Sequence, residues 1–530
     1  MRYNIKWVIK FHIFLFVFGV GVLAKKTEAE IIYYITKDIL FINGCDANTL
    51  PHPFRYRVLH QIEQLNSGFL ESDVYDYRTF DPNITRNYRV IIFYRCPWNQ
   101  RVNKSIILAR ELNKKVLFDI DDLVIDKKYT KLIPFLKTLK PKEKKIYDDG
   151  VKKMRRTLLH CDGAITTTKI LANELKKYVP KVFINHNVAS EEMWELSKNA
   201  LITKSNKTNG NNVTIGYFSG SITHNSDIEM IKPALIKILK EYDNVKLLFL
   251  GELTLQENFI NYTEKIINKK FTDWRQLPKI ISNVDINIAP LENTIFNQAK
   301  SENKWVEASL VKVPTIASNI GSFKNSIRHN ETGLLCDNIN DWYISLKTLI
   351  NNQELRKYIG ENAYYFCKRK YNTIYSGRKL ANYINKIANK HIGFFLPSLD
   401  KSGGIYVILK LACNLKDEGW DVDLILPQGN NIFFEFQSYK FNVISLQNNV
   451  MSSQYDVIVA TLYSTFFSVL AYYKAKKHLY LVQNYETDFY SYGNYFRSIA
   501  EKTYLSPFGI EYITISKWCE HWLLGKYNQK

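Results

Sequence analysis

Charged and polar residues that could bind a phosphorylated ligand gather in one stretch of the sequence, residues 284–335. An alternating apolar run predicts a buried strand that stops at Pro290, and a helix should begin near Ser301. Lys304 and Glu307 are three positions apart, so both should project from one side of that helix. A strand, a polar loop, a helix with a carboxylate and a further strand form half of a nucleotide-binding α/β crevice.

Part of this stretch resembles a known family. The letters KSENKWVEASLVKVPTIAS, followed by HNETGLLC, are similar to the donor-binding segment of retaining glycosyltransferases with the GT-B fold, the large family four. The resemblance implies that Glu307 holds the ribose of a nucleotide sugar. The family usually carries a second glutamate eight positions earlier, near the transferred sugar, and this chain has Ala299 there. The alternative interpretation of Glu307 is a surface glutamate in an ordinary Rossmann-like domain.

A small-residue turn precedes a predicted helix earlier in the same domain. Free N–H groups at Gly220 and Ser221 would suit a diphosphate. Members of the resembled family usually have an Arg or Lys pair near this turn, whereas this chain has His224. By position, Lys300 or Lys304 could supply the missing charge. We therefore predict donor-binding residues Gly220, Ser221, Lys304 and Glu307, and catalytic candidates Lys300, Lys304 and His224.

Further charged residues point to the acceptor side. Arg55 and Arg57 follow the loop CDANTLPHPF and are expected at a helix N-terminus, a suitable place for an anionic group; simple solvent exposure is the alternative. Asp119 and Asp121 lie in FDIDD, at the end of a predicted strand. An Asp-x-Asp would suggest a metal-bound sugar nucleotide in the GT-A fold. Within a GT-B-like pattern we favour a structural or acceptor-side role, with no metal and no other cofactor.

The length of 530 residues predicts about three domains. The Asn-rich stretch 197–213 lacks periodicity and is interpreted as a linker. Residues 1–29 hold a short apolar run with basic flanks, which favours an interfacial helix over a buried terminal helix. The predicted divisions are an N-terminal acceptor domain (30–205), a donor-binding domain with a helix that crosses back (206–390), and a third unit (391–530).

The third unit repeats the opening pattern of a strand, a Gly-rich turn at Gly403 and Gly404, a helix and a strand. It resembles the N-terminal domain of bacterial rhamnosyltransferases that build cell-surface glycans. This resemblance implies an acceptor-type half only. We therefore expect residues 391–530 to fold but to transfer no sugar alone, acting as an acceptor-docking module or as the remnant of a tandem enzyme. Residues 1–390 should then keep their activity without it.

Composition limits the partners. The formal net charge of +21 favours polyanionic ligands such as nucleotide diphosphates or acidic lipid surfaces. The lysines are spread through the chain and no RNA- or DNA-binding signature is present, so we expect no nucleic-acid partner. The seven cysteines are scattered, which fits a reducing cytosol.

Together these features predict an α/β chain with a GT-B unit of two Rossmann-like domains and a third Rossmann-like half-unit. The predicted function is transfer of a hexosyl or rhamnosyl group from a nucleotide sugar to a surface polysaccharide or its lipid-linked precursor. The predicted location is cytoplasmic, with peripheral contact to the membrane. A non-catalytic glycosyltransferase-like binding or assembly protein is the first alternative, and a basic nucleic-acid-binding protein is the second.

Overall fold

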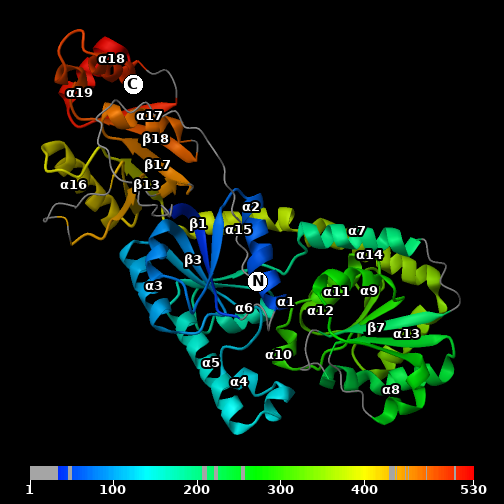
Figure 1. Cartoon of the computed structure of the whole chain (residues 1–530). Helices are drawn as coiled ribbons and strands as arrows, with labels where there is room; N and C mark the ends of the chain where they lie inside the picture. The colour runs from blue at the N-terminus through cyan, green and yellow to red at the C-terminus, as the bar shows by residue number, and fades with distance from the viewer. Residues whose placement is uncertain are drawn as a thin grey trace, which may run out of the picture.

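The computed structural model describes residues 34–45, 51–205, 212–219, 225–251, 257–428, 436, 438–447, 449–451, 453–472, 474–505 and 509–529. These residues form three α/β units, each built on a parallel sheet, and the first unit lies between the other two (Figure 1). The prediction of two Rossmann-like domains in a GT-B fold, with a third Rossmann-like unit, is confirmed. The predicted interfacial segment 1–29 lies outside the described residues.

The first domain has a seven-stranded sheet in the order β16-β1-β3-β4-β5-β6, with β2 also paired to β1. The central strands are buried on both faces, as their continuous apolar sequences require. The strands are β1 (Tyr34–Asn43), β2 (Ser72–Asp76), β3 (Tyr88–Tyr94), β4 (Lys115–Asp119), β5 (Gly163–Thr166), β6 (Val182–Ile184) and β16 (Asn449–Met451). The helices and helical turns are α1 (Pro51–Phe54), η1 (Arg55–Leu59), α2 (His60–Ser67), η2 (Pro82–Asn87), α3 (Gln100–Glu111), α4 (Lys127–Thr130), η3 (Pro134–Lys137), α5 (Pro141–Leu159) and α6 (Lys169–Leu175).

The second domain has the strand order β12-β11-β10-β7-β8-β9, which in chain order is the 3-2-1-4-5-6 arrangement of a dinucleotide-type sheet. The order reverses between β7 and β10, where such sheets bind ligands. The strands are β7 (Val213–Phe218), β8 (Val245–Leu250), β9 (Ile266–Lys269), β10 (Ile286–Ala289), β11 (Thr315–Ser318) and β12 (Leu334–Cys336). The helices are α8 (Asn225–Glu241), η5 (Glu257–Lys265), η6 (Trp274–Gln276), α9 (Leu277–Ser282), α10 (Ile295–Gln298), α11 (Asn303–Ser309), α12 (Gly321–Ser326), α13 (Ile339–Asn351) and α14 (Gln353–Lys370).

The crossing helix is α15 (Thr373–Ile387), which returns from the second domain and packs against α2 of the first (Figure 1). Leu380 and Ile384 enter the core of the first domain. The two helices approach closely because Gly377 has no side chain: a Cβ at this position would lie 2.1 Å from Ser67 Oγ. Helix α15 therefore occupies the place expected for the helix that crosses back at the end of the 206–390 division.

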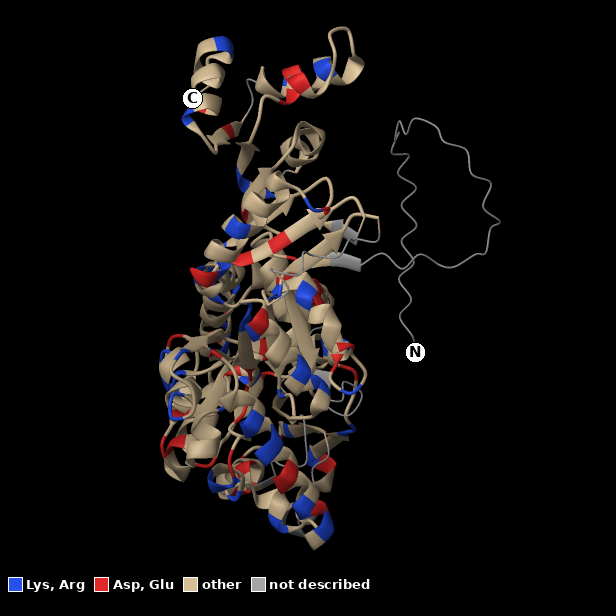
Figure 2. Ribbon diagram, turned by 90° about the vertical axis from the view of Figure 1, so that its left-hand side faces the viewer, with Lys and Arg blue, Asp and Glu red and all other residues tan. Residues whose placement is uncertain are grey.

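The third unit repeats the 3-2-1-4-5-6 order in the sheet β15-β14-β13-β17-β18-β19. Its strands are β13 (His391–Phe395), β14 (Asp421–Leu426), β15 (Asn442–Ser445), β17 (Tyr455–Ala460), β18 (Ala475–Val482) and β19 (Ile510–Thr514). Its helices are α16 (Gly403–Asp417), α17 (Tyr463–Ala471), η8 (Glu486–Phe489), α18 (Tyr495–Tyr504) and α19 (Lys517–Tyr527). Charged residues of both signs occur along all three units (Figure 2).

The third unit is joined to the first domain by backbone and by buried charge. Its β16 pairs in parallel with the start of β1 and so adds a strand to the first sheet. Lys114 Nζ lies 3.1 Å from Asp421 Oδ2, and both side chains are enclosed. Gln454 N–H donates to Asp38 Oδ1 at 3.0 Å. These contacts argue against the independence that the sequence suggested for residues 1–390, because the first sheet takes an edge strand from beyond them.

Two local expectations are wrong. Residues 197–205 of the predicted linker are helical, because they continue α7 (Glu191–Ser205), which packs against α9. Arg55 and Arg57 do not mark a helix N-terminus, because the helical segment already begins at Pro51, where proline is accepted in a first turn. Among the described residues, no helix combines the length and the hydropathy that a membrane crossing requires.

Candidate functional site

The first and second domains meet at a group of charged side chains. Arg55 Nη2 lies 3.2 Å from Glu307 Oε1, and Tyr56 OH donates to the same oxygen at 2.7 Å. The Arg55 guanidinium stacks between the rings of Tyr56 and Trp274, 4.4 and 4.3 Å from their centres. Its Nε and Nη1 are buried without a hydrogen-bond partner in the described part of the chain. The structure thus brings a predicted acceptor-side residue, Arg55, onto the predicted donor residue, Glu307.

The two carboxylate oxygens of Glu307 have different surroundings. The hydrogen bonds from Arg55 and Tyr56 both reach Oε1, and Oε2 accepts none from the described residues. The side chain is 13% exposed. One carboxylate oxygen is therefore fixed by the first domain, while the other is available to a ligand hydroxyl.

Two lysines lie beside Glu307. Lys304 is one helical turn earlier on α11, and its Nζ is 4.3 Å from the centre of the Tyr217 ring. That nitrogen is enclosed and, among the described residues, has no hydrogen-bond partner. Burial lowers the pKa of Lys304 to about 8; the positive charge of Lys300 adds to the shift, and the carboxylates of Asp227 and Glu307 oppose it. Burial also lowers the pKa of Lys300.

Several hydrogen-bond donors of Arg55 and Lys304 are buried and have no acceptor among the described residues. Arg55 offers two buried N–H groups and Lys304 an enclosed ammonium. A buried donor without an acceptor is costly, so such groups concentrate where a ligand supplies the acceptor. A multiply charged anion between the two domains would satisfy all of them.

Asp227, which follows His224 in the segment where the resembled family has its Arg or Lys pair, also belongs to this group. It is buried and accepts hydrogen bonds from the Glu292 amide at 3.0 Å and from Asn297 Nδ2 at 3.1 Å. It therefore orders the loop that follows β10, and its charge acts on both Lys300 and Lys304. An aspartate near the start of a helix has many roles, so the sequence alone carried no specific signal.

Ala299 is enclosed by the first domain. It is fully buried within that domain's core, and its carbonyl accepts a 2.9 Å hydrogen bond from Thr168 Oγ1. A glutamate here would push a carboxylate among apolar side chains, which costs several kcal/mol, about 2–7 for an unpaired polar group. The packing around position 299 therefore disfavours the carboxylate that the resembled family has there.

A second carboxylate lies at the start of α11. Glu302 Oε1 accepts from Tyr371 OH at 2.6 Å and from Ser326 Oγ at 3.2 Å, and His186 Nδ1 is 3.4 Å away. Burial raises the pKa of Glu302, but the hydrogen bond and charge of His186 outweigh it, so that pKa lies below its usual value. In turn, Glu302 raises the pKa of His186 above its usual value despite burial. His186 belongs to the first domain, so this pair also bridges the boundary.

The other predicted acceptor-side residues lie inside the first domain. Arg57 binds Asp119 through two hydrogen bonds of 2.9 and 2.7 Å, and both side chains are completely enclosed. Arg95 Nε donates to Asp121 Oδ1 at 2.7 Å, and Arg95 Nη2 reaches Asp122 at 2.5 Å. Arginines therefore neutralise the FDIDD carboxylates and fix the end of β4, which favours the structural role over acceptor contact for Arg57 and Asp119. Gly220, Ser221 and His224 lie outside the described residues.

Gly403 and Gly404 open α16 of the third unit, at the end of β13. Ser402 caps this helix by accepting a 3.2 Å hydrogen bond from the Ile405 amide. A Cβ on Gly404 would come within 3.5 Å of the Gln483 side chain, which is ordinary contact. The pair lies at the point where the strand order of this sheet reverses, the usual ligand edge of such a fold.

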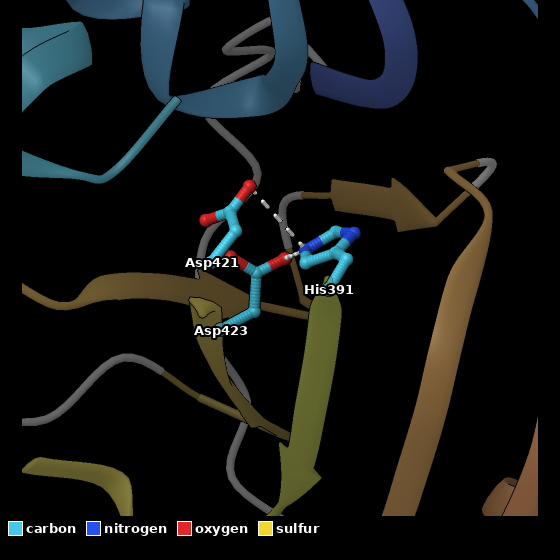
Figure 3. A group of neighbouring side chains, drawn as sticks. All are labelled: His391, Asp421 and Asp423. Atoms are coloured by element: carbon cyan, nitrogen blue, oxygen red, sulfur yellow. Dashed lines mark hydrogen bonds and ion pairs between the residues drawn. The ribbon is translucent and has the colours of Figure 1, made fainter. Parts of the chain in front are cut away.

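One group of possible metal ligands stands out among the described residues: His391, Asp421 and Asp423 (Figure 3). His391 Nε2 lies 2.9 Å from Asp423 Oδ2 and 3.9 Å from Asp421 Oδ2. Asp423 also accepts from Tyr455 OH at 2.6 Å, and Asp421 faces the ammonium of Lys114. Protein groups already bind these oxygens. We therefore interpret the cluster as a buried polar contact that joins the third unit to the first domain.

The sequence of the second domain is similar to a known family. Residues 213–352 match the family model described as "Glycosyl transferases group 1". A Staphylococcus aureus protein, the capsular polysaccharide biosynthesis glycosyltransferase CapM, is 28% identical over 188 residues, which are 34% of this chain and 48% of CapM. The chain thus spans about half the length of this curated relative.

Solved structures are similar at low identity. The Anabaena protein HepE, in complex with UDP and glucose, is 11% identical, with a TM-score of 0.44 over 66% of this chain and 100% of HepE. Sucrose-phosphate synthase from Thermosynechococcus elongatus is 11% identical, with a TM-score of 0.46 over 66% of this chain and 99% of the synthase.

Proposed function

We propose that this chain is a glycosyltransferase that uses a nucleotide sugar. The observation that carries the proposal is the convergence of Arg55, Lys300 and Lys304 beside Glu307 at the boundary of the first two domains. A nucleoside diphosphate presents both groups that this arrangement suits: a diphosphate for the cations and a ribose diol for the carboxylate. The match of residues 213–352 to group 1 glycosyl transferases supports the proposal, because that segment contains both lysines and Glu307.

The proposed catalysis depends on the negative charge that develops on the leaving group. When the sugar leaves, negative charge grows on the diphosphate, and preorganised cations in an enclosed site stabilise it. Lys304 and Lys300 would face the phosphates, and Arg55 would approach from the first domain. Glu307 Oε2 would accept a hydrogen bond from the ribose. Fixed ammonium and guanidinium groups supply the positive charge that a metal ion would otherwise bring, so we expect a metal-independent reaction; retention of configuration is implied by the family resemblance.

The acceptor side is the finer part of the proposal. We infer that the acceptor is a cell-surface polysaccharide or a lipid-linked glycan precursor, and that the transferred sugar is a hexose or rhamnose. The similarity to a capsular polysaccharide glycosyltransferase supports this class of acceptor. The proposed location is the cytoplasm, in peripheral contact with the membrane that carries such acceptors.

A non-catalytic binding protein is the second candidate, favoured by Ala299, which leaves no carboxylate at the family's sugar-side position. Both candidates bind a nucleotide, so the separating measurement is release of the sugar from a nucleotide sugar. Tight nucleotide binding without hydrolysis or transfer, across the common UDP-, GDP- and dTDP-sugars, would select the binding protein.

The deciding experiment is calorimetric titration of the full chain with UDP, GDP and dTDP. At least one should bind, and Lys304→Gln should weaken it roughly 10- to 100-fold, the worth of a hydrogen bond to a charged group. Lys357→Gln is the matched control, because Lys357 is an exposed lysine of the same domain. No binding by any nucleotide, or equal binding by the Lys304 variant, would overturn the assignment.

A further inference from the structure

Nearly half of the formal charge lies in one short segment of the first domain. Residues 127–156 read KKYTKLIPFLKTLKPKEKKIYDDGVKKMRR, with twelve Lys or Arg and three Asp or Glu, whereas the whole chain has a net charge of +21. The charge is therefore less evenly spread than the overall sequence suggested. The segment comprises α4, η3 and α5, which form the lower tip of the first domain in Figure 1.

Each of the three acidic residues of this segment already has an ion-pair or hydrogen-bond partner within the segment. Asp148 lies 2.8 Å from Lys127 Nζ, and Asp149 lies 3.4 Å from Lys152 Nζ. Glu143 accepts the Lys140 amide at the start of α5. The exposed lysines of the segment whose ammonium groups lie within ion-pair distance of no carboxylate among the described residues include Lys131, Lys137, Lys142, Lys145 and Lys153.

Helix α5 has an apolar side and a basic side. Val151 and Leu158 are buried, and Met154 packs against the core of the first domain. Lys142, Lys145, Lys153 and Arg156 lie on the opposite, exposed side, with Ile146 among them at 66% exposure. A basic helix face with an exposed aliphatic residue has the composition of a surface that lies on a bilayer.

A hollow lies between α4 and α5. Its volume is about 410 Å³, and its lining is Lys127, Lys128, Thr130, Lys131, Lys144 and Asp148. A single lipid phosphate is small enough for such a hollow. Four lysines line it, of which Lys127 and Lys144 lie 2.8 and 3.9 Å from the Asp148 carboxylate.

We propose that the α4–α5 surface, residues 127–156, binds an anionic phospholipid bilayer. Charge complementarity selects the partner: single basic side chains close to an anionic membrane each add to binding, and the basic face and the hollow offer them together. Exposed Ile146 is suited to the headgroup boundary. Nucleic acid is disfavoured, because the exposed face of α5 carries no aromatic ring on which a base could stack.

The position of the surface links it to the candidate site. Helix α4 packs against α10 of the second domain, and Phe296 of α10 inserts toward the core of the first. Lys300 follows α10 directly. A bilayer held at α4–α5 therefore lies next to the boundary where the cations and Glu307 meet, so a membrane-borne acceptor would reach the site over a short path. This last step rests on the proposed function, whereas bilayer binding itself does not.

The test is co-sedimentation of the full chain with vesicles of phosphatidylcholine alone or mixed with phosphatidylglycerol. We expect binding only to the mixed vesicles, weakened by salt. One variant replaces Lys137, Lys142, Lys145 and Lys153 by Gln. Each basic residue near the bilayer contributes roughly fivefold, so the loss of four should lower partitioning by roughly several hundredfold. The matched control replaces four exposed lysines of the second domain, Lys240, Lys246, Lys270 and Lys357, by Gln and should bind like the unmodified chain.

Each other outcome contradicts the proposal. Failure of the unmodified chain to bind anionic vesicles overturns it, and so does equal loss in both variants, which would indicate general charge. Full binding by the α4–α5 variant would assign the membrane contact to another segment, and selective loss of oligonucleotide binding would assign the surface to nucleic acid. Nucleotide titration of the α4–α5 variant separates the two proposals. The variant should bind the same nucleotide as the unmodified chain with the same affinity, even if its binding to vesicles is lost.

Discussion

The guanidinium of Arg55 and the carboxylate of Glu307 lie 3.2 Å apart across the boundary of the first two domains, although 252 positions separate them in the chain. Each residue lies on a helical segment of a different domain, η1 for Arg55 and α11 for Glu307, so this pair exists only when the domains approach. The pair leaves Glu307 Oε2 and two Arg55 N–H groups available. A ligand bound there would contact both domains at once, and binding and domain closure would be coupled.

Replacement of Glu307 tests the donor assignment. Glu307→Ala should weaken nucleotide binding and sugar transfer roughly 10- to 100-fold, because a lost hydrogen bond to a charged group costs about 1.5–3 kcal/mol. Circular dichroism should show an intact fold. Glu354→Ala, which removes an exposed carboxylate in the same domain, is the control and should leave the kinetics unchanged. Unaltered kinetics in the Glu307 variant would remove this residue from the site.

The pH dependence of nucleotide affinity should report on Lys304. Its pKa is lowered to about 8, so the ammonium that would attract a diphosphate is lost as the pH rises through 8. Affinity should therefore be constant near pH 7 and should fall between pH 8 and 9.5. Lys304→Arg keeps its charge throughout this range and should flatten the profile. An equally steep fall in the arginine variant would assign the titration to another group.

Chelation tests the metal prediction. Arg57 and Arg95 occupy the FDIDD carboxylates, so transfer should persist in excess EDTA. Activity that disappears with the chelator and returns with manganese would instead indicate a metal role for Asp121 or its neighbour.

Removal of the third unit should destabilise the first domain. A chain ending at residue 390 lacks the β16 partner of β1 and leaves Lys114 without Asp421. The shortened chain should unfold at a lower temperature than the full chain, measured by circular dichroism. Equal unfolding temperatures, with sugar transfer retained, would restore the independence that the sequence suggested.

Glu486 should make the third unit sensitive to pH. Burial raises its pKa to about 7 from an ordinary 4.5, against the hydrogen bonds donated by Tyr480 OH and the Tyr463 amide. Its contribution to stability is fully present below pH 4.5 and is lost as the pH rises to 7, a change of about 3 kcal/mol. Glu486→Gln stays neutral and should reduce this pH dependence of thermal unfolding. Glu520→Gln, at an exposed position, should not.

The sequence predicted the strands well because parallel strands covered on both faces are continuous apolar runs. The runs VIIFY, KVLFDI and VTIGYF are typical of such strands, and they coincide with β3, β4 and β7 to within two residues at each end. Residues 197–205 were misjudged because asparagine and lysine conceal the helical period, and only packing against α9 reveals the buried side of α7.

The candidate site was only partly predictable, since its geometry depends on contacts between domains. Glu307 could be named from a family resemblance, but its partners Arg55 and Tyr56 come from a helical segment that the sequence assigned to the acceptor side. The enclosure of Arg57 and Asp119 was equally hidden, because nothing in FRYR or FDIDD shows that these charges pair. The Glu302–His186 contact likewise joins two segments with no local signal.

The strand that β16 gives to β1 has a consequence for synthesis. Ser453, two residues beyond β16, bonds Lys37 of β1 across 416 positions. At a typical translation rate of 5–20 residues per second, about 20–80 s pass between the emergence of one partner and of the other. During that interval the start of β1 has no β16 neighbour, and an open strand edge is a template for pairing with other chains. The first domain leaves the ribosome before the second but gains its edge strand only after the second has been made, so its yield should depend on how fast the later residues follow.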